Sequence, residues 1–232
     1  MNEYNDVDSM LAKLTTLQIG SEVYDEDGLN EADLSDDERK LLVDRTTQSL
    51  ILLKTFDGRI VGTGFLVTTK GHVITNYQIL PNEQSFANGS IFGCTNTSPE
   101  SFKLELVASL QEIDIAIMRL PALALPICPL RPQVPTIGRY TIVQGFTLNN
   151  LPGYFLPVNS NGHVKRIDFH CGSLTSKYFG CPGSPVLSAN GSYFGVVYPT
   201  KPSENNSSKF VNVDVIYCML KARSLQIDLI YD

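Results

Sequence analysis

The sequence predicts an all-β protein with two β-barrels of about six strands each, an acidic N-terminal arm and a short C-terminal helix. Two observations support this fold class. From residue 45 onward, short runs rich in β-branched and aromatic residues follow one another, and turn-forming pairs such as Asp57-Gly58 and Asn190-Gly191 separate them. Between residues 121 and 138 stand five prolines, which exclude a central strand and indicate an extended crossover between two halves.

Residues 1–44 form the acidic arm. Residues 1–45 hold 13 of the 24 Asp and Glu residues against four Lys and Arg. This composition is typical of a solvated, partly disordered segment. One stretch, DLSDDERKLLVD, favours a short helix, because Ser35 can cap its N-terminus and the acids that follow favour the first turn.

The remaining residues, 45–232, are expected to form the domain proper. We expect the first barrel over about 45–122, the crossover over about 121–138 and the second barrel over about 139–215. The predicted strands include SLILLKTF, IVGTGFLVTT, GHVITN, FKLELVASL, DIAIMRL, RYTIVQGF, GHVKRIDF, SPVLSA, SYFGVVYP and KFVNVDVI. Only VIYCMLKARSL, at about 215–225, has the character of a helix.

Composition narrows the class of protein. No apolar run is long enough to span a membrane, and the acidic N-terminus does not resemble a signal peptide, so we expect an intracellular protein, cytoplasmic or nuclear. Five cysteines without paired spacing suggest a reducing compartment and no structural metal site, and nothing in the sequence indicates a cofactor. Beyond the arm, 11 acids face 14 bases, so a nucleic-acid partner is not expected.

Three segments, in order, carry a resemblance to a known family. They are GTGFLVTTKGHVITNYQIL at 62–80, DIAIMRL at 114–120 and FGCPGSPVLSANGSYFGVV at 179–197. Together they resemble the trypsin-like serine proteases, and most closely the HtrA/Deg branch. The resemblance implies the double-barrel fold and places a general base, an orienting carboxylate and a nucleophile at particular residues.

At those positions the chain departs from the family's pattern. The base position falls on Gln78, whose amide has no proton affinity near neutral pH. The carboxylate position falls on Asp114 and is retained. The nucleophile position falls on Pro182, which has neither a hydroxyl nor a backbone N–H, so half of the oxyanion hole is lost and only Gly180 can supply its N–H.

A displaced nucleophile is the alternative. Cys181 precedes the nucleophile position, but a thiolate needs a nearby histidine or other positive group, and the three histidines, His72, His163 and His170, lie away from the base position in the sequence. Ser184 is a second substitute, although the G-x-S-G-S-P variant of the family's motif already accounts for it as a structural residue.

The leading hypothesis is therefore a pseudoprotease, a catalytically inactive homologue that binds an extended peptide or protein segment and acts as a regulatory module. The alternatives are an endopeptidase that uses Cys181 or another displaced nucleophile, and a scaffold protein that binds through the acidic arm. The resemblance also implies a possible homo-oligomer, a trimer. Fewer than 20 residues follow the last predicted strand, too few for the PDZ domain that HtrA relatives often carry.

Overall fold

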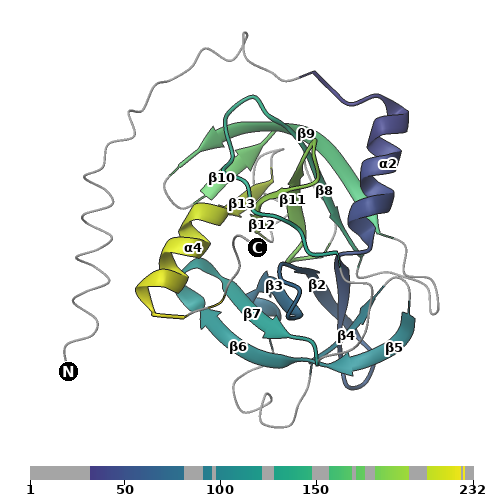
Figure 1. The fold of residues 1–232 in the computed structure, drawn as a ribbon, viewed down its shortest axis with the longest axis vertical. Helices are drawn as coiled ribbons and strands as arrows, with labels where there is room; N and C mark the ends of the chain where they lie inside the picture. The colour runs from purple at the N-terminus through teal and green to yellow at the C-terminus, as the bar shows by residue number, and fades with distance from the viewer. Residues whose placement is uncertain are drawn as a thin grey trace.

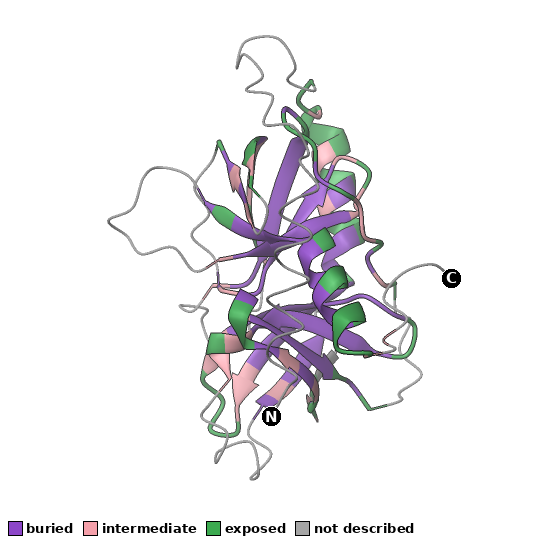
Figure 2. Cartoon of the chain, turned by 90° about the vertical axis from the view of Figure 1, so that its left-hand side faces the viewer, coloured by how far each residue is buried: buried purple, intermediate pink, exposed green. Residues whose placement is uncertain are grey.

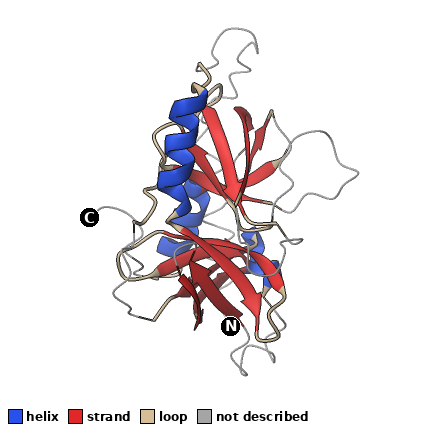
Figure 3. Ribbon diagram, turned by 90° about the vertical axis from the view of Figure 1, so that its right-hand side faces the viewer, coloured by secondary structure: helices blue, strands red, loops and turns tan. Residues whose placement is uncertain are grey.

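A computed structural model describes residues 32–80, 91–95, 98–121, 128–147, 157–168, 171–175, 181–198, 208–225 and 227. Two bodies of β-strands lie one above the other, and helices lie along the outside of the strands (Figures 1 and 3). The strands of both bodies are mostly buried (Figure 2). The all-β, double-barrel fold class predicted from the sequence is confirmed.

The first described element is helix α2, Asp36–Thr47. Its N-terminus has a capping box: the Ser35 side chain accepts from the Glu38 N–H, and the Glu38 carboxylate accepts from the Ser35 N–H. The helix crosses residue 44, where the sequence suggested the end of the arm, because its last turn is anchored to the second barrel. Leu42 packs in one cluster with Tyr140 and Ile142.

Hydrogen bonds with a buried glutamine of the second barrel also hold α2 in place. Gln144 is fully buried, and its side-chain oxygen accepts from Thr46 Oγ1 at 2.6 Å. Its amide nitrogen donates to the Val43 carbonyl at 3.1 Å and to Thr47 Oγ1. A buried amide with both ends satisfied fixes the helix to one position on the barrel.

The first barrel is one curved seven-stranded sheet in the order β5-β4-β1-β2-β3-β7-β6. Its two edge strands, β5 and β6, are consecutive in the chain and are separated only by the buried Leu104, so the chain itself joins the two edges. This bend accounts for seven strands where about six were expected. The strands are β1 (Leu50–Thr55), β2 (Ile60–Leu66), β3 (His72–Asn76), β4 (Ile91–Thr95), β5 (Ser98–Lys103), β6 (Glu105–Leu110) and β7 (Ile115–Arg119).

The second barrel is closed, in the order β10-β13-β12-β11-β8-β9. All its pairings are antiparallel, and its interior is filled by one cluster that includes Val143, Phe194 and Phe210. Its strands are β8 (Tyr140–Gly145), β9 (Val158–Ile167), β10 (Cys171–Leu174), β11 (Pro185–Ser188), β12 (Tyr193–Val197) and β13 (Lys209–Asn212).

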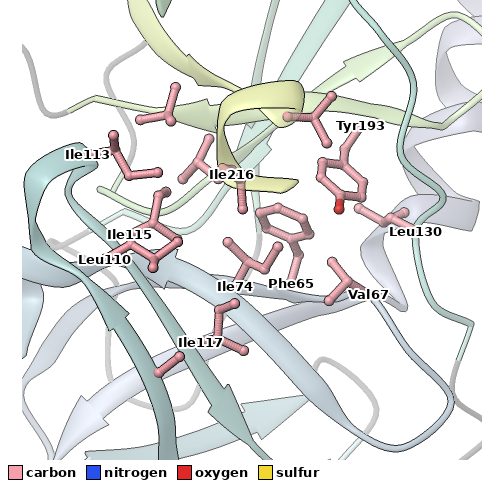
Figure 4. Close-up of a cluster of buried hydrophobic side chains, with 14 of the residues drawn as sticks. Phe65, Val67, Ile74, Leu110, Ile113, Ile115, Ile117, Leu130, Tyr193 and Ile216 are labelled. Carbon is pink, nitrogen blue, oxygen red and sulfur yellow. The ribbon is translucent and has the colours of Figure 1, made fainter. Parts of the chain in front are cut away.

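A third hydrophobic cluster joins the barrels. Helix α4, Val213–Ala222, begins directly after β13 and contributes Ile216 and Leu220. The first barrel contributes Phe65, Ile74 and others, and the second contributes Tyr193, whose ring lies 5.1 Å from that of Phe65 (Figure 4). The two barrels therefore share a core, and α4 closes it.

The described part of the crossover, residues 128–138, contains no helix and ends in a turn at residues 137–138. Tyr193 donates to the Arg131 carbonyl and accepts from the Gln133 N–H, so the crossover pairs with the start of β12. Leu130 donates to the Leu66 carbonyl on β2. Among the described residues, no helix is long and apolar enough to cross a membrane.

Candidate functional site

Gln78 lies in a single 3₁₀ turn, η1, Tyr77–Ile79, which follows β3 directly. Its backbone N–H donates to Asp114 Oδ1 at 2.8 Å, and its side-chain Nε2 donates to Asp114 Oδ2 at 2.6 Å. One residue thus supplies donors to both oxygens of one carboxylate. The exposed Gln78 side chain makes no other hydrogen bond within the described part of the chain.

Asp114 lies at the end of a second 3₁₀ turn, η2, Gln111–Ile113, immediately before β7. Its backbone is left-handed, with φ 54° and ψ 40°, a conformation that aspartate tolerates better than most residues. The Asp114 carbonyl accepts from the Tyr77 N–H at 3.0 Å and from Asn76 Nδ2 at 3.2 Å. The side chain and backbone of Asp114 therefore both hold the turn that carries Gln78.

The charge of Asp114 is not fully compensated. Burial raises the pKa of the Asp114 carboxyl, and the hydrogen bonds from Gln78 and Tyr77 offset only part of this effect. Among the described residues, no arginine or lysine forms an ion pair with Asp114. Gln78 thus orients the carboxylate without neutralising it.

Pro182 lies in the short loop that enters β11. Its carbonyl accepts from the Thr63 N–H on β2 at 2.8 Å. The next residue, Gly183, has φ +86°, and a Cβ there would lie 2.0 Å from the Thr63 carbonyl oxygen and 2.3 Å from Thr75 Oγ1. Only glycine fits between the loop and the strand, so the loop from Cys181 to Ser184 is pressed against the first barrel.

Gly62 shows that the two parts of the site meet. A Cβ on Gly62 would lie 2.7 Å from Ile79 Cδ1, in the turn that carries Gln78, and 3.1 Å from the Pro182 carbonyl oxygen. Both segments therefore lie against the same glycine of β2. The structure brings Gln78, Asp114 and Pro182, which are distant in the sequence, to one place between the barrels.

The sequence profile of the trypsin-like peptidase domain matches residues 62–196, more than half of the chain. The chain belongs to the trypsin-like peptidase family. The matched range contains Gln78, Asp114, Cys181 and Pro182, and the family resemblance inferred from the three segments is confirmed. A comparison with curated protein sequences gave no significant match.

Solved structures with a similar fold include proteases from two bacteria. A serine endoprotease from Yersinia pestis is 16% identical, with a TM-score of 0.66 over 85% of this chain and 69% of that chain. The active form of the Rv3671c protease from M. tuberculosis is 17% identical, with a TM-score of 0.64 over 87% of this chain and 92% of that chain. At these identities the likeness establishes the fold alone.

Cys181 is poorly suited to act as a nucleophile in this trypsin-like peptidase domain. Its side chain is 1% exposed and packs in the cluster shared by the barrels. Burial raises the pKa of the Cys181 thiol to about 12, so at neutral pH it is protonated. Its N–H donates to the Phe146 carbonyl, and its carbonyl accepts from Ser184 Oγ at 2.8 Å. Ser184 is itself fully buried.

The described histidines lie outside the site. His72 is at the start of β3, where its Nδ1 is hydrogen-bonded to Thr68 Oγ1 at 2.8 Å. His163 is on β9, packed against Tyr140, with Nε2 3.3 Å from Asp33 Oδ1. Neither is hydrogen-bonded to Cys181 or Asp114 in any described contact. His170 and Gly180, the expected oxyanion-hole donor, lie outside the described residues.

Tyr198 was not singled out from the sequence. It follows β12 and is half-buried. Burial raises the pKa of the Tyr198 phenol, and the charges of Asp114 and Cys171 contribute to the rise. Its only sequence signal is its position directly after the third segment of the family resemblance, which ends at Val197.

Asn76 is a second residue missed from the sequence. It is fully buried at the end of β3, and its Oδ1 accepts no hydrogen bond from a described residue. Its Nδ2 donates to the Asp114 carbonyl, so the Asn76 amide helps to fix the backbone at Asp114. Within the described ranges, no cluster of three His, Cys, Asp or Glu side chains has the arrangement of a metal site.

Proposed function

We propose that this trypsin-like peptidase homologue is catalytically inactive and binds an extended peptide or protein segment in the site between its barrels. The observation that carries the proposal is the contact between Gln78 Nε2 and Asp114 Oδ2 at 2.6 Å. The amide occupies the place where the resemblance puts an imidazole and makes the contact with the carboxylate that an imidazole N–H makes in a catalytic triad.

An amide in that place cannot perform the base's task. It has no basic nitrogen near neutral pH, so it cannot take a proton from an attacking hydroxyl. Pro182 offers no hydroxyl to be deprotonated, and its missing N–H removes one donor to a developing oxyanion. In a triad, loss of one member alone costs several orders of magnitude in rate.

The alternative, an endopeptidase that uses Cys181, receives no support from the site. Its thiol is buried, its pKa is raised and none of its described contacts is with a histidine. An active thiol nucleophile needs the reverse arrangement, with an accessible sulfur beside a group that stabilises the thiolate.

Binding an extended peptide requires exposed hydrogen-bonding groups but neither a general base nor a nucleophile. The Gln78 amide is held by Asp114 and exposed, so its oxygen and its second N–H remain available to an amide group of a ligand. HtrA/Deg-like proteins, which the sequence resembles, bind extended peptides through main-chain contacts that do not depend on a triad. The partner we propose is therefore an extended segment. Trimerisation, implied by the same resemblance, stays a prediction.

The test uses β-casein, an unfolded protein, labelled with fluorescein. We expect no fragments after a day in reducing buffer, and binding detectable by fluorescence anisotropy. Gln78→Arg places a large cation in the site and should weaken binding at least about fivefold, a change of roughly 1 kcal/mol. Leu41→Arg, at an exposed position on α2, is the matched control and should leave binding unchanged.

Two results would contradict the proposal. Fragments that form with the parent protein and disappear with Cys181→Ala would identify a cysteine-type peptidase. Binding that Gln78→Arg and Leu41→Arg affect equally would place the partner elsewhere on the surface.

A further inference from the structure

The C-terminal end of helix α4 contacts the turn that leads into Asp114. The contact is made by Arg223, the residue that caps the C-terminus of α4. Its Nη1 donates to the Ser109 carbonyl at 2.7 Å, and its Nη2 donates to Glu112 Oε1 at 2.5 Å. Ser109 lies in β6 and Glu112 in η2, the next element along the chain, so one guanidinium joins the strand and the turn. A guanidinium suits this task because its donors form a planar fork.

The backbone at the end of α4 is itself fixed. Ser224 is left-handed, with φ 52°, and its N–H donates to the Lys221 carbonyl at 3.0 Å. The Leu225 N–H donates to the Leu220 carbonyl, also at 3.0 Å. These two hydrogen bonds form a Schellman motif, and both leucines pack in the cluster shared by the barrels. The guanidinium of Arg223 is therefore attached to a backbone of defined position.

The turn η2 is held on two sides. On its apolar side, Leu110 and Ile113 are buried and lie in the same cluster as Ile216 of α4 (Figure 4). On its polar side, Glu112 is exposed, so apolar packing does not fix it. Arg223 therefore supplies the polar half of the contact between α4 and η2.

The backbone of Asp114 needs such support. A residue other than glycine adopts a left-handed conformation at a cost, and the conformation persists where the surrounding structure holds it. In this conformation the Asp114 carbonyl accepts from the Tyr77 N–H, and the carboxylate accepts from the backbone and the side chain of Gln78. A turn that is no longer held would let Asp114 relax, and the Gln78 amide would lose its fixed orientation.

We propose that Arg223 is a positioning residue: it holds η2 against α4 and so keeps Asp114 in the conformation that accepts both hydrogen bonds from Gln78. The contacts run from Arg223 to Glu112, through η2 to Asp114, and from Asp114 to Gln78. Where it concerns binding, the inference rests on the proposed function, because an amide that is already oriented binds an extended partner at a lower entropic cost. Loss of Arg223 should therefore weaken binding without removing any group that the partner contacts.

The effect of Arg223 should be local. Its side chain is 35% exposed and that of Glu112 is 53% exposed, and ion pairs with this much exposure add little to the stability of a whole domain. Local opening of a turn, in contrast, is seen at the amides that the turn protects. Amide hydrogen exchange therefore separates a positioning role from a general loss of stability, which would affect the strands of the barrel as well.

The test is hydrogen exchange of the full chain, followed by NMR without any ligand. In Arg223→Gln, the N–H groups of Tyr77 and Gln78, which both donate to Asp114, should exchange at least about threefold faster, while the amides of β1 keep the rates of the parent. The signal of the Gln78 side-chain amide should also move toward that of a solvated glutamine, because its hydrogen bond to the carboxylate weakens.

Arg119→Gln is the matched control. It removes another exposed ion pair of the first barrel, from Arg119 Nη2 to Glu105 Oε2 at 2.6 Å, at the opposite end of β7 from Asp114. We expect this variant to leave the exchange of both site amides and the side-chain signal unchanged.

Binding of fluorescein-labelled β-casein gives a second readout. Arg223→Gln should lower the affinity at least about threefold, and Arg119→Gln should not change it. Unchanged exchange of Tyr77 and Gln78 in Arg223→Gln, or equal acceleration there and in β1, would overturn the inference. The exchange data need no partner, so a parent protein that fails to bind casein would refute the proposed function while the role of Arg223 is still decided. Faster local exchange with unchanged casein affinity would confirm the role of Arg223 and place the partner away from Gln78.

Discussion

Gly183→Ala tests whether the loop at Pro182 is held by the first barrel. Gly183 has φ +86°, and leaving glycine at such an angle costs about 1–2 kcal/mol. The added Cβ would lie 2.0 Å from the Thr63 carbonyl oxygen, so the loop must move off β2 and lose the hydrogen bond from the Thr63 N–H to the Pro182 carbonyl, about 1 kcal/mol. Imperfect repacking adds roughly 1–3 kcal/mol. We expect a total loss of about 4 kcal/mol.

Urea unfolding measures this loss. Far-ultraviolet circular dichroism is the probe, because the chain has no tryptophan. With a slope of about 2–3 kcal/mol/M, the midpoint should fall by roughly 1.5 M. Gly58→Ala is the matched control: its φ is +85°, but nothing lies within 4 Å of the added Cβ, so only about 1–2 kcal/mol is expected. Equal losses in the two variants would refute the close approach between the loop and β2.

Three further predictions concern the site and its supports. Iodoacetamide at pH 8 should alkylate the exposed Cys128 much faster than Cys181, which should react only after unfolding, since a pKa of about 12 leaves about one thiolate in 10⁴. Rapid labelling of Cys181, mapped by mass spectrometry, would contradict its burial. Burial raises the pKa of Asp114, so the stability that its proton contributes is present below its unfolded pKa of about 3.9 and is lost as pH rises through the folded pKa. The free energy of unfolding of the parent, relative to Asp114→Asn, should therefore fall as pH rises above about 4, and a flat or rising difference would count against this. Gln144→Leu should lower the free energy of unfolding by about 2–3 kcal/mol and speed amide hydrogen exchange in α2, because Thr46 and Thr47 lose their hydrogen bonds to the buried Gln144 amide. Unchanged exchange would show that other contacts hold α2 on the barrel.

Much of the fold follows from local sequence signals. Turn pairs such as Asn190-Gly191 and alternating strands fix the sequence of hairpins, and five prolines mark the crossover. The capping box of α2 could also be predicted, since Ser35 and Glu38 stand three residues apart. The position of α2 could not be predicted, because it depends on Gln144, about a hundred residues away, which has no local signal that it will be a buried partner.

The candidate site was predictable in part. The motifs place Gln78, Asp114 and Pro182, and the structure brings Pro182 and the turn that carries Gln78 to the same glycine of β2, while Asp114 is hydrogen-bonded to Gln78. The motifs do not show that Gln78 donates hydrogen bonds to both oxygens of the Asp114 carboxylate, because these contacts depend on the left-handed backbone of Asp114. The pairing of Tyr198 with Lys209 depends on strand register, which the sequence alone does not fix.

The shared core closed by α4 also has a consequence for synthesis on the ribosome. The strands of the first barrel are all complete by Arg119, yet Phe65 and Ile74 have their final neighbours only when Ile216 and Leu220 of α4 arrive. A nascent chain therefore exposes these apolar side chains while the second barrel is being made, and such exposure favours aggregation or capture by a chaperone. A stop codon shortly before α4 would release a chain that holds nearly every strand but lacks the closure of its core.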